Sequence, residues 1–143
     1  MNYKTIQRIE THIIREGETK FTLSSPEAIV DYMRELQDAD VEKMLAIYLN
    51  NQNQVICESI IGIGTTSRCT CHPRDIIKIA LLVGANSIIL AHNHPSGTNY
   101  PSPEDKDFTG LVRGACQMFD IRLLDHIIIA KNAYYSFSNE GIL

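Results

Sequence analysis

The sequence has no apolar run long enough to cross a bilayer. The longest candidate, residues 76–83, is interrupted by Lys78, whereas a membrane-spanning helix needs about 20 mostly apolar residues. The N-terminus, Met1-Asn2-Tyr3-Lys4, also lacks the apolar core of a secretion signal. These absences argue against a membrane protein and predict a cytoplasmic location.

The sequence likewise lacks a cluster of basic residues. Its 143 residues include 13 Lys and Arg against 17 Asp and Glu, which gives a formal net charge of −4, and the basic residues are spread thinly. Domains that bind nucleic acids usually carry a basic patch or stripe. Nucleic acid is therefore disfavoured as the main partner, although a local basic patch formed by folding stays open.

The four cysteines do not have the spacing of a zinc ribbon, because Cys69-x-Cys71 has no second pair to complete it. In a chain without an export signal, we expect them to be reduced thiols. A catalytic cysteine paired with His72 or His126 is the alternative, and nothing in the sequence places such a pair together.

Helix start signals and apolar periodicity predict an α/β fold. Helices are expected over residues 25–37, from Pro73 to Gly84, and from Pro103 onward. Apolar runs bounded by polar turns predict strands at residues 43–49, 54–61, 86–91, 121–130 and 134–138. Residues 1–24 are weakly patterned apart from a short strand at 9–14, and no repeat or linker interrupts residues 1–143. The pattern predicts a single-domain sandwich in which about three helices flank a mixed sheet.

The most informative stretch is His92-Asn93-His94, which follows the apolar strand ending at residue 91. Two histidines at i and i+2 project to the same side of an extended chain. Ser102-Pro103 then signals a helix start, which places Asp105 in the first turn. Two imidazoles and one carboxylate make three ligands and leave a fourth position for water, as in a catalytic zinc site. The alternatives are a chance His-x-His and a capping box formed by Ser102 and Asp105 alone.

The spacing H-x-H-P-x(6)-S-x-x-D, formed by His92, His94, Pro95, Ser102 and Asp105, resembles the JAMM motif of the JAB/MPN metallopeptidases. The wider strings ILAHNHPSG, PSPED, CHPRD and LLDHIIIA are similar to those of the RadC family of bacterial proteins. This resemblance, which covers most of the chain, implies a JAB/MPN-like (cytidine-deaminase-like) fold. It also implies one Zn²⁺ per chain, bound by the two histidines and the aspartate, and hydrolysis of a peptide or isopeptide bond in a peptide or protein substrate.

Hydrolysis by a metal-activated water needs a proton acceptor that is not a metal ligand. Glu58 is the candidate general base, because it shares a strand face with Ile56 and Ile60, and a carboxylate among apolar side chains is costly unless it is paired. The JAMM resemblance also implies a catalytic glutamate on a strand upstream of His-x-His. The alternative is that this face points outward and Glu58 is solvated. Glu42 precedes the first predicted strand, and Glu104 is expected in solvent.

Four further residues are candidates for the site. Ser102 is expected to cap the helix and, from the resemblance, to stabilise the oxyanion, two roles that compete for one side chain. His72, which precedes Pro73, either lines the cleft or makes a hydrogen bond at the start of the helix. Asp125 and His126 lie within a predicted strand and are expected to form a buried structural pair; the alternative is a second metal site. One of the two could hold a zinc ligand in place.

Two other functions stay open. A DNA-repair-associated or nuclease-like metal protein is disfavoured by the acidic charge, and by the lack of room for the N-terminal helix-hairpin-helix region of larger RadC-like proteins. A non-catalytic JAB scaffold is disfavoured because every motif residue is present. The sequence carries no code for a particular substrate and does not fix the oligomeric state.

Overall fold

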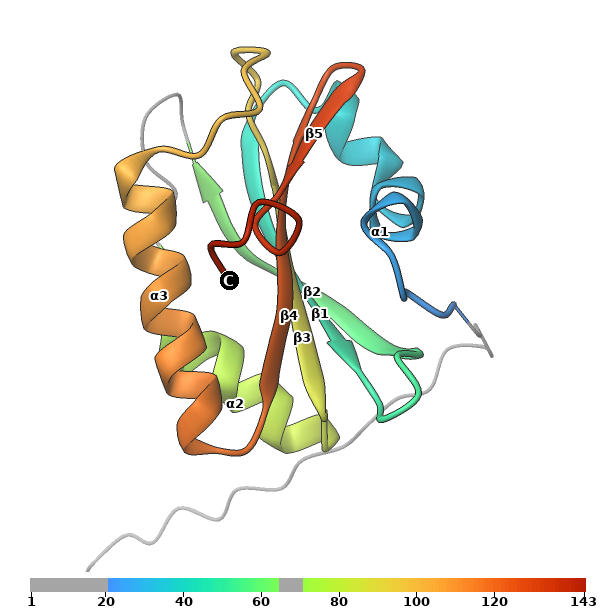
Figure 1. Ribbon diagram of the computed structural model, residues 1–143, viewed down its shortest axis with the longest axis vertical. Helices are drawn as coiled ribbons and strands as arrows, with labels where there is room; N and C mark the ends of the chain where they lie inside the picture. The colour runs from blue at the N-terminus through green and yellow to red at the C-terminus, as the bar shows by residue number, and fades with distance from the viewer. Residues whose placement is uncertain (1–20, 65–70) are drawn as a thin grey trace, which may run out of the picture.

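The computed structural model describes residues 21–64 and 71–143, which build a five-stranded mixed sheet with helices on both faces (Figure 1). The elements follow in the order α1 (Pro26–Tyr32), the 3₁₀ helix η1 (Arg34–Asp38), β1 (Glu42–Leu49), β2 (Val55–Gly64), α2 (Pro73–Val83), β3 (Ser87–Asn93), α3 (Pro103–Met118), β4 (Arg122–Ala130) and β5 (Ala133–Ser136). The predicted α/β fold is confirmed. The strand predicted at residues 9–14 lies outside the described residues.

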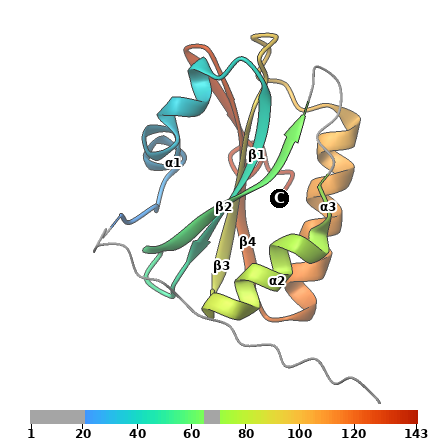
Figure 2. The same cartoon turned by 180° about the vertical axis from the view of Figure 1, so that it is seen from behind.

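The sheet has the strand order β2-β1-β3-β4-β5. β3 and β4 pair in parallel, and the other neighbouring strands pair antiparallel. α1 covers one face of the sheet, whereas α2 and α3 cover the other (Figure 1 and Figure 2). None of the helices in the two described ranges is long and apolar enough to cross a membrane.

Local sequence signals set the helix boundaries. Ser25 caps α1 by accepting a backbone N–H from the first turn at 3.2 Å, and proline stands at the start of all three α-helices. Gly84 ends α2 in the left-handed conformation, with a φ of 66°. The helix expected over residues 25–37 is divided into α1 and the more tightly wound η1, and in this arrangement both Ile29 and Leu36 reach the core.

Two hydrophobic cores lie on the two faces of the sheet. In β1, Met44, Ala46 and Tyr48 pack toward α2 and α3, and the residues between them pack toward α1. β3 is buried over its whole length. His92, near the end of β3, continues the row of side chains that face α3 and is fully buried.

β4 contains an irregularity that changes which of its side chains face α3. One residue of β3 pairs with Leu123 and the next pairs with Asp125, so Leu124 is an extra residue in the ladder. A shift of one residue reverses the facing of the strand beyond it. Leu123 and His126, three residues apart, therefore both face the layer occupied by α3.

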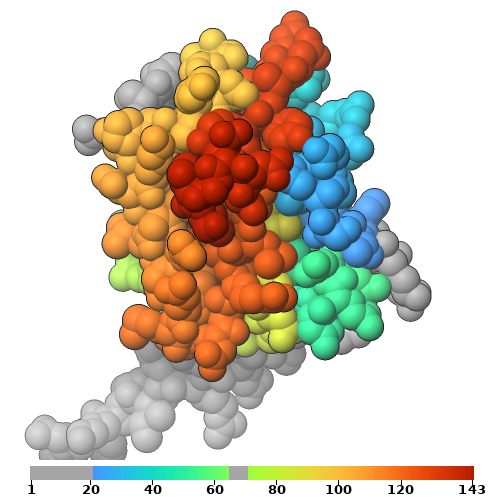
Figure 3. Space-filling view, viewed as in Figure 1, coloured from blue at the N-terminus to red at the C-terminus, as the bar shows by residue number. Residues whose placement is uncertain are grey.

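The chain after β5 covers the outer side of the layer that α3 occupies. It turns back against α3, where Phe137, Ile142 and Leu143 lie beside Lys106; this turn is dark red in the space-filling view (Figure 3). Phe137 is buried and stacks on the ring of His126, with the two centroids 4.7 Å apart and an interplanar angle of 18°. The turn therefore helps to shield His126 from solvent.

Candidate metal centre

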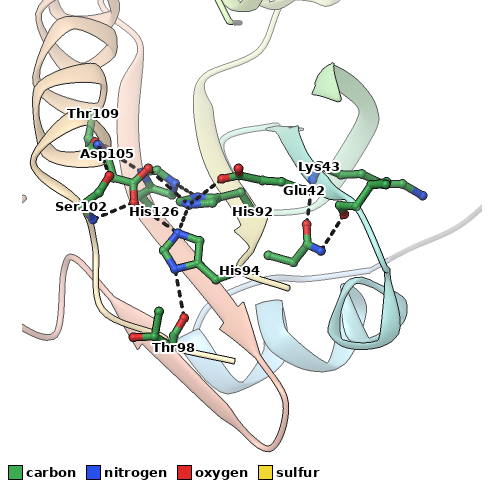
Figure 4. Close-up of polar contacts among 11 residues, drawn as sticks. Glu42, Lys43, His92, His94, Thr98, Ser102, Asp105, Thr109 and His126 are labelled. Atoms are coloured by element: carbon green, nitrogen blue, oxygen red, sulfur yellow. Dashed lines mark hydrogen bonds and ion pairs between the residues drawn. The ribbon is translucent and has the colours of Figure 1, made fainter. Parts of the chain in front are cut away.

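Four side chains converge at the end of the sheet beside the N-terminus of α3 (Figure 4). Glu42 comes from the start of β1, His92 from the end of β3, His94 from the loop that follows, and Asp105 from the first turn of α3. One ligand atom of each lies within 4.8 Å of the others, and we call these residues the four-residue cluster. Because Met44 pairs with His92 in the antiparallel β1–β3 ladder, Glu42, two residues earlier, lies on the same face beside it.

The distances within the cluster suit a small metal ion. The Nε2 atoms of His92 and His94 lie 2.9 Å apart. Oδ1 of Asp105 lies 3.4 Å from Nε2 of His92, and Oδ2 lies 3.3 Å from Nε2 of His94. Zinc bonds to nitrogen and oxygen are about 2.0–2.2 Å long, so tetrahedral ligand atoms are roughly 3.3 Å apart. These three side chains have the spacing of ligands to one metal, whereas Oε1 of Glu42 stands further off, at 3.8 Å from Nε2 of His92.

Hydrogen bonds around the cluster determine which ring nitrogens have a lone pair that faces the centre of the cluster. Nδ1 of His94 lies 2.9 Å from the backbone oxygen of Thr98. Because a carbonyl oxygen only accepts, Nδ1 carries a proton, and in the neutral ring Nε2 has the lone pair. Burial would raise the pKa of the Asp105 carboxyl, but the adjacent rings of His92 and His94 hold that pKa well below its usual range. Asp105 in turn raises the pKa of His94. The cluster therefore favours a positive charge at its centre.

Asp105 also belongs to the cap of α3. Oγ of Ser102 accepts the backbone N–H of Asp105 at 3.1 Å, and Oδ2 of Asp105 accepts the backbone N–H of Ser102 at 2.8 Å. This reciprocal capping box orients the carboxylate and leaves Oδ1 directed at His92. The capping box and the metal-ligand geometry, which the sequence presented as alternatives, are therefore compatible in one arrangement.

Glu58 does not lie beside the cluster, contrary to expectation. It pairs with Ile47 in the β1–β2 ladder, and Ile47 packs in the core under α1, so Glu58 is on the opposite face of the sheet from the cluster. Its side chain is exposed, as are those of Ile56 and Ile60. Burial raises the pKa of the Tyr32 hydroxyl, and the nearby Glu58 carboxylate raises it further. The face of β2 that carries Ile56, Glu58 and Ile60 points outward. This is the alternative that the sequence left open, in which Glu58 is solvated.

Glu42 occupies the position that Glu58 was expected to fill. The sequence placed the start of the strand at Lys43, but β1 begins at Glu42. Met44 and Ala46 face α3, so the two-residue alternation of the strand extends back to Glu42. That alternation is the sequence signal that identifies Glu42 once the strand is lengthened by one residue.

Asp125 and His126 have different partners because they face opposite sides of β4. Nε2 of His126 lies 2.7 Å from Nδ1 of His92, and burial lowers the pKa of His126 well below its ordinary value. Asp125 instead accepts hydrogen bonds from the backbone N–H groups of His126 and Ser138 and from the hydroxyl of Ser136. Asp125 thereby joins β4 to β5 and to the chain that follows.

His72 and the described cysteines lie outside the cluster. His72 is exposed at the N-cap of α2, where its carbonyl oxygen, not its ring, accepts a hydrogen bond at 3.0 Å. Burial raises the pKa of the thiols of Cys57 and Cys116, to about 11 for Cys116. Both ring nitrogens of His126 contact the side chains of His92 and Thr109. The alternative of a catalytic cysteine paired with His126 is therefore not supported. Cys69 lies outside the described residues.

Comparisons with known proteins indicate the family of this chain. The family described as a RadC-like JAB domain matches residues 23–142. A UPF0758 protein of Carboxydothermus hydrogenoformans is 41% identical over 127 residues, which cover 88% of this chain and 56% of that protein. A UPF0758 protein of Streptococcus sanguinis is 47% identical over 107 residues, covering 75% of this chain and 47% of that protein. The UPF0758 protein YfjY of Escherichia coli is 37% identical over 142 residues, covering 98% of this chain and 89% of YfjY.

The chain spans about half the length of the first two relatives and most of the length of YfjY. The family match includes every residue of the four-residue cluster and all the helices and strands of the described structure. It confirms the resemblance carried by the histidine and serine-aspartate motifs. The chain belongs to the RadC-like JAB domain family.

Proposed function

We propose that this protein is a zinc-dependent hydrolase that cleaves a peptide or isopeptide bond. The observation that carries the proposal is the convergence of His92, His94 and Asp105 at 2.9–3.4 Å, with the Glu42 carboxylate standing further off. Two imidazoles and one carboxylate are a frequent donor set of catalytic zinc, and they leave a coordination position open. Zinc held there would supply a Lewis acid that polarises a carbonyl and lowers the pKa of a bound water to about 7.

We assign proton transfer to Glu42. Its Oε1 lies 3.8 Å from Nε2 of His92, beyond the spacing of the three ligands, and its side chain is 21% exposed. A carboxylate at this position can accept a proton from the attacking water and donate it to the leaving amine. Glu42 replaces Glu58 in this role, because Glu58 lies on the other face of the sheet.

Ser102 supports both the helix and, in this proposal, the reaction. Its oxygen accepts the backbone N–H of Asp105 at 3.1 Å. Accepting that bond uses a lone pair and leaves the hydroxyl proton available as a donor. Capping and oxyanion stabilisation therefore use different parts of one hydroxyl, so the two roles need not compete.

A peptide or protein substrate suits the charges of the site better than a nucleic acid does. The two carboxylates of the cluster, from Glu42 and Asp105, balance the charge of a bound Zn²⁺, so the site carries no excess positive charge to attract a phosphate backbone. The formal net charge of −4 on the whole chain also disfavours a polyanion. Among the described residues, one group of side chains has the composition and spacing to hold a metal ion, whereas nucleases often use two metal ions. A cytoplasmic location is part of the same proposal.

The proposal predicts zinc in the protein purified without added metal, at about one ion per chain. Binding to the native state stabilises it: free zinc at 100 times its Kd adds about 2.7 kcal/mol to the free energy of unfolding. A chelator should therefore lower the Tm, and zinc should restore it. Elemental analysis and thermal unfolding in solution measure both effects. A metal-free protein whose Tm does not respond to zinc would contradict the proposal.

A further inference from the structure

A buried chain of hydrogen bonds lies behind His92 and joins β3, β4 and α3 (Figure 4). Nδ1 of His92 lies 2.7 Å from Nε2 of His126, and Nδ1 of His126 lies 2.6 Å from Oγ1 of Thr109. The same Oγ1 lies 2.6 Å from the backbone oxygen of Asp105. His92 and His126 are fully buried and Thr109 is 3% exposed, so water does not compete for these bonds.

The chemistry of the last acceptor fixes the direction of every bond in this chain. The carbonyl oxygen of Asp105 can only accept, so the hydroxyl of Thr109 donates its one proton to it. Oγ1 of Thr109 must then accept from Nδ1–H of His126. His126 is fully buried and its hydrogen-bond partners, His92 and Thr109, carry no negative charge, so its ring is neutral. A neutral imidazole has one N–H, so Nε2 of His126 accepts from Nδ1–H of His92. The proton of His92 is thus on Nδ1, and the lone pair of Nε2 is directed at His94 and Asp105.

We infer that Thr109 and His126 are positioning residues that hold His92 in the tautomer able to bind a cation through Nε2. The inference depends on the proposed function only in taking that cation to be zinc. His94 reaches the equivalent tautomer by a simpler route, because its Nδ1 donates to the Thr98 carbonyl. His92 is fully buried, and the acceptor for its Nδ1–H is the side chain of His126. The β4 bulge supplies His126 for this purpose, and Phe137 stacks on its ring.

Removing the Thr109 hydroxyl should reverse the chain of donors. In Thr109→Val the Nδ1–H of His126 loses its acceptor, and an unpaired buried donor is costly. The proton of His126 then shifts to Nε2, which donates to Nδ1 of His92, and His92 carries its own proton on Nε2. Both rings stay neutral and no proton is gained or lost. Nε2 of His92 then presents an N–H to the cluster in place of a lone pair.

The experiment compares wild type, Thr109→Val and Thr109→Ser, the last of which keeps the hydroxyl. Long-range ¹⁵N–¹H spectra of the zinc-free proteins report the tautomer of His92, and competition with a chromophoric chelator reports the Kd for zinc. We expect the Nδ1–H form and equal affinity in wild type and Thr109→Ser. Thr109→Val should show the Nε2–H form of His92 and a Kd about 10–100-fold higher, as for other partners of metal-bound histidines. An unchanged tautomer and an unchanged Kd in Thr109→Val would overturn the inference.

A second pair of variants applies if Thr109→Val does not fold. In His126→Gln the amide oxygen can accept from Nδ1–H of His92 and the amide N–H₂ can donate to Thr109, so zinc affinity should stay close to wild type. His126→Leu offers neither group and should weaken zinc binding about 10–100-fold; equal affinity in both variants would overturn the inference. Failure of the proposed function looks different, because a wild type that binds no zinc would still show the Nδ1–H tautomer of His92.

Discussion

Glu42→Gln should keep its zinc and lose hydrolysis. The substitution preserves side-chain size and removes only the charge that accepts a proton, and loss of a general base typically lowers turnover about 10²–10⁴-fold. Because Oε1 of Glu42 lies 3.8 Å from Nε2 of His92, further than the oxygens of Asp105 lie from the histidines, the affinity for zinc should change little. Single-turnover cleavage and zinc content, measured on one sample, report both effects.

Glu58→Gln is the matched control for this variant. It makes the same chemical change at an exposed position on the opposite face of the sheet. Hydrolysis and zinc content should both equal those of wild type. If Glu42→Gln expels zinc, Glu42 is a ligand and not the base; if Glu58→Gln abolishes turnover, the choice of Glu42 is wrong.

Asp105→Asn should weaken zinc binding by at least about 100-fold, more than the loss of a hydrogen-bond partner outside the ligand set. A neutral amide oxygen is a poorer ligand than a carboxylate. The same oxygen can still accept the backbone N–H of Ser102, which Asp105 accepts at 2.8 Å, so the helix cap and the fold should survive. Chelator competition gives the affinity, and urea unfolding of the metal-free protein gives the stability.

Glu104→Gln separates the ligand effect from a general loss of negative charge. Glu104 is exposed in the same first turn of α3 and does not belong to the four-residue cluster. Its variant should bind zinc as tightly as wild type, whereas His92→Ala/His94→Ala should bind none. Equal affinity in Asp105→Asn, the double variant and wild type would exclude this site.

The positions of His92, His94 and Asp105 could be predicted because short-range rules place all three. An i, i+2 pair at the end of a strand points one way whatever the strand pairs with. A Ser-Pro helix start places the residue three positions after serine in the first turn, where it can reach back to the cap. The family resemblance then indicated that the two local motifs, His92-x-His94 and Ser102-x-x-Asp105, belong to one site.

The proposed general base could not be chosen in this way, because its position depends on the sheet register. The β1–β2 ladder has irregularities near both ends of β1, and one extra residue reverses which face a strand presents. Glu58 was expected to face the core because Ile56 and Ile60 share its strand face, but that face of β2 is exposed. Glu42 was passed over because β1 begins one residue earlier than its apolar run indicates.

The partner of His92 was similarly hidden in β4. Simple alternation from Leu123 would turn His126 away from α3, and the extra residue Leu124 turns it back. Sequence reasoning could therefore name Asp125 and His126 as buried candidates without deciding which of them contacts His92. The contact with His92 at 2.7 Å distinguishes them.

Cleavage of a peptide and isopeptide library by the zinc-loaded protein tests the central claim most directly. We expect cleavage of amide bonds that stops when a chelator is added, returns with zinc and is absent in Glu42→Gln. A fully zinc-loaded protein that cleaves no member of the library would contradict the claim and favour a scaffold. Zinc-dependent nicking of DNA that is lost in Glu42→Gln would contradict it in favour of a nuclease.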